Sequence, residues 1–235
     1  MVTGVLLMKK TRYLLMSDLH IGSGRCNIAA VIERIEEHCP ETIIIVGDLF
    51  EEGVVNNGEM DLVQYLLRNH KKVVRIDGNH DDSYHLPGID MIKELHWQIG
   101  NKRFCAIHGH RLDPCSLIFG QPAIDRFFLL LISLLRMVGF LGYNLSDWLD
   151  KYHREFSENL AKKAIKFAAR RRIKADVIIC GHTHQPMERT VVAKGRKVHY
   201  YNLGSCLDGE CSYGTIDEDG NFQLHVVPNQ NKSNV

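Results

Sequence analysis

The 235-residue sequence has seven cysteines but no Cys-x-x-Cys pair, and the cysteines are odd in number and scattered. This spacing argues against a thiolate zinc site and against a disulfide framework. Cys105 and Cys180 lie inside apolar runs, so we expect both to be small core residues. Cysteines used in this way indicate a reducing compartment, and we therefore expect a cytoplasmic protein.

An excess of charge of either sign is also missing. The formal net charge is +1, from 29 Lys and Arg residues against 28 Asp and Glu residues. Global charge therefore gives no argument for a nucleic acid or a membrane as partner, although a local cluster could still provide one. The composition, 45% hydrophobic and 24% charged, is that of a soluble globular protein long enough to bury a substantial core.

No apolar run is long enough to span a membrane. The most apolar stretch is Phe127–Gly142, and Arg136 interrupts it, so the uncharged part falls short of the roughly 20 residues that a span needs. At the N-terminus a short apolar piece precedes the lysines, which is the reverse of a secretory signal. We therefore expect no signal peptide and interpret Phe127–Gly142 as a buried or interfacial helix.

The first half of the chain alternates between two hydrophobic periods. Apolar residues three and four apart predict helices at 28–38 and 60–70, and apolar or β-branched runs predict strands at 12–17, 42–46 and 72–76. This strand–helix–strand–helix–strand order predicts right-handed crossovers and a parallel sheet. The continuous apolar run Thr42–Val46 is typical of a strand buried on both faces.

The remainder of the chain predicts a different arrangement. Residues 96–99 and 103–108 flank a turn at Gly100 and Asn101 and predict a hairpin, and the segments after Ala175 predict a mostly antiparallel sheet. Between them lies a helical insertion at about 111–174, whose last helix we expect to begin with Ser146 as its N-cap.

Two features of this insertion each allow two interpretations. Phe127–Gly142 is either core or dimer packing, or a surface that binds acyl chains. Lys151–Lys174 carries nine Lys and Arg residues against two Glu residues, so it is either a solvated face or a surface that docks on anionic lipid. If the second interpretation of each feature is correct, residues 127–174 would make peripheral contact with the inner membrane.

Metal-ligand residue types follow five predicted strands at the point where each strand ends. In chain order they are Asp18 and His20, then Asp48, then Asn79, His80 and Asp81, then His108, then His182 and His184. The carboxyl ends of strands in a doubly wound sheet share one edge, so we expect these side chains to meet there. Each motif alone is common in ordinary turns, and only their joint occurrence indicates a site.

Seven of these nine residues, all except His80 and Asp81, are the candidate metal ligands. Seven oxygen and nitrogen ligands without a thiolate exceed the needs of one tetrahedral zinc ion. They suit two metal ions that share a bridging carboxylate, for which Asp48 is a candidate. Imidazole, amide and carboxylate ligands favour Mn²⁺, Fe or Zn²⁺ over Mg²⁺ or Ca²⁺, and Mn²⁺ is the ion that we expect. Two divalent ions about 3.5–4 Å apart can activate water and hold a phosphate for in-line attack, which predicts phosphoester hydrolysis.

The ordered motifs DLH, GD, GNHD, HG and GHTH resemble those of the calcineurin-like metallophosphoesterase superfamily from Asp18 to His184. The resemblance implies a four-layer αββα sandwich of the α/β class, formed by a single domain over residues 1–235 with a helical cap at about 111–174. It implies one metal ion held by Asp18, His20, Asp48 and His184, and a second held by Asp48, Asn79, His108 and His182. It also implies that His80 is not a ligand and acts with Asn79 on the transferring phosphate or the leaving oxygen, with Asp81 as orienting partner.

Within the superfamily, the motifs MSDLHIGS, VGDLF, ICGHTH and YNLGS are similar to those of the UDP-2,3-diacylglucosamine pyrophosphohydrolase family of lipid A synthesis. In that family a helical insertion after HG forms a lid that shelters acyl chains. The implied substrate is UDP-2,3-diacylglucosamine or a related lipid-linked nucleotide diphosphate. Two positions depart from the pattern: His110 stands where the family usually has Asp, with Asp113 at the later acidic position, and His80 stands where its best-characterised members have Arg.

Two other functions remain as alternatives. The first is a phosphodiesterase that acts on a nucleic acid or a cyclic nucleotide at the same site. Nucleic acid is the less expected partner, because a long basic groove with stacking aromatics is not visible in the sequence. The second is a non-catalytic interaction module, which would have lost metal ligands, whereas all seven are present here.

Overall fold

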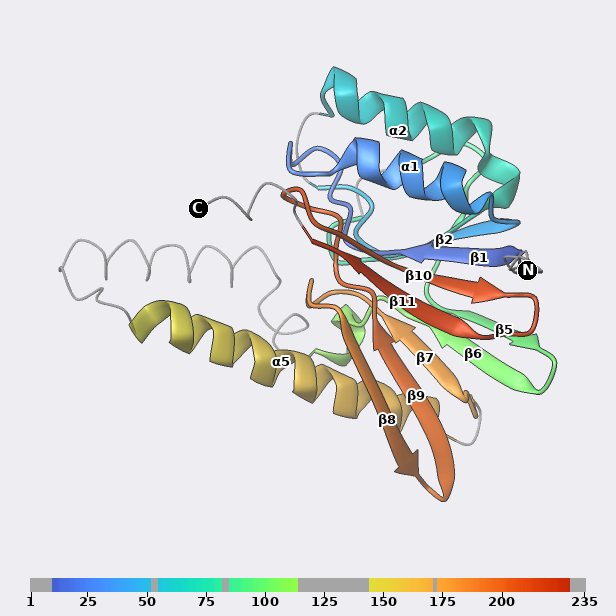
Figure 1. Ribbon diagram of the computed structural model, residues 1–235, viewed down its shortest axis with the longest axis vertical. Helices are drawn as coiled ribbons and strands as arrows, with labels where there is room; N and C mark the ends of the chain where they lie inside the picture. The colour runs from blue at the N-terminus through green and yellow to red at the C-terminus, as the bar shows by residue number, and fades with distance from the viewer. Residues whose placement is uncertain (1–9, 52–54, 82–84, 114–143, 171–172, 229–235) are drawn as a thin grey trace, which may run out of the picture.

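Two mixed β-sheets form the centre of the structure (Figure 1), a computed structural model that describes residues 10–51, 55–81, 85–113, 144–170 and 173–228. The first sheet has the strand order β11-β10-β1-β2-β3-β4. Its strands are β1 (Thr11–Met16), β2 (Thr42–Val46), β3 (Val73–Ile76), β4 (Met91–Ile92), β10 (Cys211–Asp217) and β11 (Phe222–Val227). The second sheet has the order β5-β6-β7-β9-β8. Its strands are β5 (Leu95–Ile99), β6 (Lys102–Ala106), β7 (Val177–Cys180), β8 (Met187–Ala193) and β9 (Arg196–Asn202).

Helices cover the outer face of each sheet and complete four layers. Figure 1 shows α1 (Ile28–His38) and α2 (Asn57–Arg68) over the first sheet, and α5 (Asn144–Ala168) across the second. Two short 3₁₀ helices, η1 (His70–Lys72) and η2 (His110–Leu112), follow α2 and β6. The predicted αββα sandwich is therefore confirmed. None of the helices in the described residues combines the length and the apolar character that a membrane crossing requires.

Strand alternation divides the core into three apolar layers. In β1, Leu14 and Met16 pack with the helices of the first sheet, whereas Leu15 packs between the two sheets. In β2, Ile44 likewise lies between the sheets, and Ile43 and Ile45 face the helices. Because successive side chains of a strand point to opposite faces, the buried parts of both strands must be apolar on both faces, as predicted for the run within Thr42–Val46.

The third apolar layer lies between the second sheet and α5. Leu160 and Ala164 are buried on α5, and Ile178 and Tyr200 are buried on the strands beneath it. The C-terminal half of α5 thus forms the outer layer of this side. The strongly apolar Phe127–Gly142 segment and half of the predicted cap lie outside the described residues, so the division into domain and cap at 111–174 stays a prediction.

Three expectations about the second half of the chain need correction. After Ala175 the pairs β8–β9 and β10–β11 are antiparallel, as predicted. Strand β7, however, pairs parallel with both β6 and β9, and the long connection between β6 and β7 allows the crossover that a parallel pair needs. Helix α5 begins at Asn144, so Ser146 lies within its first turn and is not the N-cap. Asn, Ser and Asp are all favoured at helix starts, so the residue types at 144, 146 and 147 could not show where the helix begins.

The third correction concerns the cysteines. Cys206 and Cys211 form a disulfide across a tight connection between β9 and β10, where their Cα atoms are 3.9 Å apart. We expected reduced cysteines because the scattered spacing gives no sign of a pair. Cys105 and Cys180 are free and buried, as predicted.

Asp176 ties together the strands that lead into the site. Its carboxylate accepts hydrogen bonds from the backbone N–H and the guanidinium of Arg103 on β6, and from Arg196 on β9 at 2.6 Å. Burial alone would raise the pKa of Asp176, but the hydrogen bonds from Arg103 and Arg196 lower it to about 2. Asp176 therefore stabilises the junction of β6, β7 and β9 when it is ionised.

The replacement Asp176→Asn is expected to lower the melting temperature at pH 7 by several degrees. The pKa of Asp176 is lower in the folded protein than its model value of 3.8, so its stabilisation is present above about pH 4 and is lost as the pH falls toward 2. Thermal denaturation of wild type and variant across this range should show curves that converge in acid. Asp61→Asn on α2 is the control, and a pH-independent difference for Asp176→Asn would contradict the assignment.

Candidate metal centre

The loops that follow β1, β2, β3, β6 and β7 carry the predicted site residues. Five of these residues have left-handed backbone conformations: φ is 53° at Asp18, 46° at His20, 51° at Asp48, 73° at His182 and 55° at His184. Residues other than glycine rarely adopt positive φ, and such strain is concentrated at functional sites. The loops are therefore held in an unfavourable conformation that turns their side chains toward one another.

Close backbone packing supports these loops at two glycines. A Cβ atom at Gly78 would overlap the Asp48 carboxylate, and one at Gly181 would overlap Ser17 and Asp18. Both contacts involve well-packed atoms that have no room to move. The glycines of the GNHD and GHTH motifs thus let neighbouring loops approach closely enough to share hydrogen bonds.

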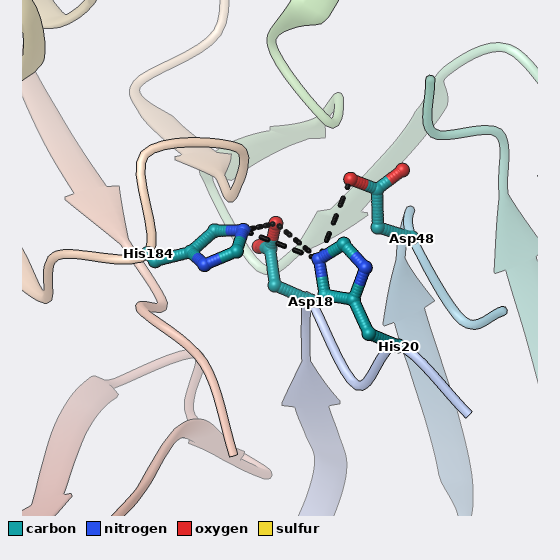
Figure 2. A group of neighbouring side chains, drawn as sticks. All are labelled: Asp18, His20, Asp48 and His184. Carbon is teal, nitrogen blue, oxygen red and sulfur yellow. Dashed lines mark hydrogen bonds and ion pairs between the residues drawn. The ribbon is translucent and has the colours of Figure 1, made fainter. Parts of the chain in front are cut away.

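Asp18, His20, Asp48 and His184 form a first ligand group (Figure 2), in which one donor atom from each residue lies within 4.8 Å of the others. The Nε2 atoms of His20 and His184 are 3.2 Å apart, and His184 Nε2 is 3.1 Å from Asp18 Oδ1. Two ligands bound about 2.1 Å from one ion are roughly 3.0–3.4 Å apart, so these separations fit a shared metal ion.

Asp18 gives a second test of the fit to a metal ion. Its Oδ2 accepts from Ser17 Oγ at 2.6 Å and from His182 N at 3.0 Å, whereas its buried Oδ1 accepts no hydrogen bond from any described residue. Burial raises the pKa of Asp18, but the His184 and His108 imidazoles outweigh burial and lower it to about 2. An ionised carboxylate with one unsatisfied buried oxygen is suited to a cation.

Asp48, Asn79 and His108 form a second ligand group. His108 Nε2 lies 3.2 Å from Asp48 Oδ2 and 3.2 Å from Asn79 Oδ1, while His108 Nδ1 donates to the carbonyl oxygen of Val46 at 2.8 Å. A neutral ring with its proton on Nδ1 therefore presents a lone pair to two oxygen atoms, an arrangement that requires a positive charge between them.

The pKa of His108 reflects the same charge imbalance. Burial lowers this pKa, but the Asp48 and Asp18 carboxylates outweigh burial and raise it to about 10. The pKa of Asp48 is lowered by His108 against the effect of its own burial. The second group thus attracts a positive charge, which either a proton or a metal ion can supply.

Asp48 links the two groups. Its Oδ2 is 3.2 Å from His108 Nε2 and 3.8 Å from His20 Nε2, and its Oδ1 accepts from the backbone N–H of His80 at 3.0 Å. One carboxylate oxygen therefore faces a histidine of each group. This position matches the predicted bridging role of Asp48.

His182 is the predicted ligand that lies apart from the second group. Its ring is edge-on to His108 with centroids 5.3 Å apart, and its Nε2 lies 3.6 Å from Asp113 Oδ2. This Nε2 is buried and makes no hydrogen bond to the described residues. His182 thus lies beside the second ligand group, but its Nε2 atom is not among the atoms of that group.

Glu51 is a site residue that the sequence analysis missed. Its Oε2 lies 2.7 Å from Nδ1 of His20, and its Oε1 lies 2.8 Å from Nδ1 of His80. One carboxylate therefore fixes the orientation of a predicted metal ligand and of the predicted catalytic histidine, as carboxylates beside metal-binding histidines commonly do. The only sequence signal is an acidic residue three positions after Asp48.

Asp81 is not the orienting partner of His80, contrary to our expectation. Its Oδ1 accepts from the backbone N–H groups of Leu49 and Phe50 and from Arg75 Nη2 at 2.8 Å, and its Oδ2 accepts from Gly78 N at 3.0 Å. The strand-end turn aims this side chain beneath the loops rather than toward His80. Asp81 therefore joins the loop of Asp48 to the loop of Asn79.

Comparison with known proteins agrees with this geometry. The family model described as Calcineurin-like phosphoesterase (Metallophos) matches residues 11–186. The solved structure of YfcE, a phosphoesterase from E. coli, is similar over 94% of both chains, with a TM-score of 0.51 and 20% sequence identity, which shows the fold alone.

A shorter similarity relates the chain to a repair protein. The DNA double-strand break repair protein Mre11 of Nanoarchaeum equitans (strain Kin4-M) is 30% identical over 86 residues. The match covers 30% of this chain and 24% of Mre11, so the chain corresponds to about a quarter of that relative's length. The family match covers most of the chain and contains every predicted ligand. The chain therefore belongs to the calcineurin-like phosphoesterase family.

Proposed function

We propose that this chain uses two divalent metal ions to hydrolyse a diphosphate bond in UDP-2,3-diacylglucosamine or a related lipid-linked nucleotide diphosphate. The observation that carries the chemistry is the position of Asp48, whose Oδ2 faces His108 on one side and His20 on the other. The substrate class is supported by the motifs shared with the lipid A enzyme family.

The chain offers one set of ligands for each ion. Asp18, His20, Asp48 and His184 would hold the first ion, and Asp48, Asn79 and His108 would hold the second, with His182 as a further ligand. When bound, two such ions polarise the phosphoryl oxygens and lower the pKa of a water molecule. The mixture of imidazole, amide and carboxylate donors without a thiolate supports Mn²⁺, with Fe or Zn²⁺ as alternatives.

His80 and Asn79 are the side chains that act on the reacting phosphate itself. Because Nδ1 of His80 is held by Glu51 at 2.8 Å, only its Nε2 is left to contact a substrate oxygen. His80 is partly exposed, so this ring is accessible to a ligand. We propose that it contacts the phosphate or protonates the leaving oxygen, and that the Asn79 amide helps to position the phosphate.

His80→Ala is expected to lower kcat by about 10²–10⁴-fold while the metal content stays unchanged, because general acid catalysis contributes this much. Glu51→Gln should lower kcat as well and also weaken metal binding, since Glu51 additionally holds His20. Both quantities are measured by steady-state kinetics and by elemental analysis of the purified proteins. Loss of both metal ions in His80→Ala would show that His80 is a ligand, against this division of roles.

The substrate is tested with the manganese-loaded protein and two esters. Hydrolysis of UDP-2,3-diacylglucosamine with a far higher kcat/KM than that of bis-para-nitrophenyl phosphate supports the lipid-linked substrate. Hydrolysis of the small diester alone keeps the phosphoesterase chemistry and refutes the lipid assignment. If neither ester is hydrolysed, the chemistry itself is refuted.

The similarity to Mre11 favours a nuclease as the second candidate function. Linear and single-stranded DNA are therefore included in the same assay. Cleavage of DNA with no hydrolysis of the lipid substrate would select this alternative.

We further propose that the basic face of α5 contacts anionic lipid headgroups. Lys162, Lys163 and Lys166 are exposed on this helix and Arg170 is exposed just after its end, so their charges are available to a membrane surface. Sedimentation with phosphatidylglycerol vesicles should decrease when Lys162, Lys163 and Lys166 are replaced together by Gln. Equal sedimentation of this triple variant and of wild type would leave α5 as a solvated face.

A further inference from the structure

Arg111 lies beside the second ligand group and is held there at two points. Its Nη2 donates to Asp77 Oδ2, and its Nε donates to His110 Nε2 at 3.3 Å. Asp77 precedes Asn79 by two residues, and His110 follows His108 by two residues. Arg111 therefore joins the two loops that supply Asn79 and His108 to the second ligand group.

The oriented guanidinium of Arg111 has further N–H groups that can donate hydrogen bonds to a ligand. A guanidinium carries five N–H groups in a planar fork, and the two bonds of Arg111 use Nη2 and Nε. In the part of the chain that the structure describes, Nη1 makes no such bond, and the side chain is 46% exposed. A guanidinium that is already oriented loses little conformational entropy when it binds an anion.

The two residues that hold this guanidinium, Asp77 and His110, each have an unsatisfied polar atom, and so does the neighbouring His182. Asp77 Oδ1, His110 Nδ1 and His182 Nε2 are buried and have no hydrogen-bond partner among the described residues. Because His110 Nε2 accepts from Arg111, the neutral His110 ring carries its proton on Nδ1, which is then a buried donor without an acceptor. The His110 ring is 5.5 Å from the His108 ring and 6.5 Å from the His182 ring. Buried polar groups are normally satisfied, so the unpaired His110 Nδ1 donor indicates a ligand that accepts a hydrogen bond.

We propose that Arg111 forms an anion subsite beside the metal centre, where it binds the phosphate group next to the one that reacts. The inference rests on the proposed function and deepens it, because it makes Arg111 a specificity-determining residue. The subsite would favour esters with two adjacent phosphates over esters with one. Asp77 and His110 act as positioning residues that aim the guanidinium.

The test measures binding as well as hydrolysis. Calorimetry with manganese in excess compares α,β-methylene-UDP, which has two phosphorus groups and is not hydrolysed, with UMP, which has one. Arg111→Gln should weaken binding of the diphosphate analogue by about 10- to 100-fold, as expected for hydrogen bonds to a charged group, and should change UMP binding by less than about twofold. Arg111→Lys should fall between, because lysine keeps the charge but loses the planar fork.

Arg68→Gln is the matched control, since Arg68 is an exposed arginine on α2 in a different layer of the fold. Equal loss for both nucleotides, no loss for either, or loss of bound manganese in Arg111→Gln would each overturn the proposal. The proposed function has a separate readout, which is hydrolysis of bis-para-nitrophenyl phosphate by the wild-type protein. A wild-type protein that fails this assay, together with an Arg111→Gln variant that loses affinity for the diphosphate analogue alone, would refute the function and keep the subsite.

Discussion

Replacing Asp48 with alanine is expected to abolish phosphoester hydrolysis and to deplete the protein of metal. Asp48 Oδ2 is the atom that faces both His108 and His20, so its removal takes a ligand from each group at once. Metal ions contribute several kcal/mol of transition-state stabilisation, and each ~1.4 kcal/mol is a factor of ten in rate. The expected loss in kcat/KM is therefore at least about 10³-fold, measured on bis-para-nitrophenyl phosphate.

Two controls separate this effect from misfolding. Asp90→Ala removes an exposed aspartate from a different loop and should change neither activity nor metal content. Asp48→Ala should keep its circular dichroism spectrum, because the apolar layers on either side of β2 do not involve this side chain. An Asp48→Ala protein that retains two metal ions and its activity would show that the carboxylate is not shared.

Replacing Arg75 with methionine is expected to destabilise the protein by about 3–5 kcal/mol, the usual effect of removing one partner from a buried ion pair. Arg75 is one of the largest fully buried side chains among the described residues, and its Nη2 lies 2.8 Å from Asp81 Oδ1. Its guanidinium also lies 5.2 Å from the centre of the Phe50 ring. The variant leaves the Asp81 carboxylate buried without its cation. Urea denaturation gives the free energy of unfolding directly.

A double variant shows whether the uncompensated charge is the cause. Arg75→Met combined with Asp81→Asn removes the charge, and the Asn oxygen can still accept hydrogen bonds from the loop backbone. We expect this protein to recover part of the stability that the single variant loses. A single variant within about 1 kcal/mol of wild type would contradict the structural role given to the pair.

The parallel part of the fold and the gathering of ligand residues could both be predicted from the sequence. Thr42–Val46 is apolar at every position after Thr42, and the structure buries these four residues between the helices and the second sheet. Parallel strands bring their carboxyl ends to one edge, so Asp18 and Asp48 had to meet once β1 and β2 were placed side by side.

The orientation of individual side chains could not be predicted in the same way. Glu51 and Asp81 both follow a ligand by a few residues, yet Glu51 turns toward His80 and Asp81 turns beneath the loop. The difference depends on loop backbones with positive φ, such as that of Asp48, which hydrophobic periodicity does not encode. The Cys206–Cys211 bond and the parallel pairing of β7 likewise depend on where the chain returns in space.

Electron paramagnetic resonance of the manganese-reconstituted protein shows whether two metal ions share Asp48. Metal analysis of the same sample gives the number of ions per chain. We expect two manganese ions per chain and the spectrum of a spin-coupled pair, with the coupling lost in Asp48→Ala. An active wild-type protein with one manganese ion per chain, or with the spectrum of isolated ions, would contradict this expectation.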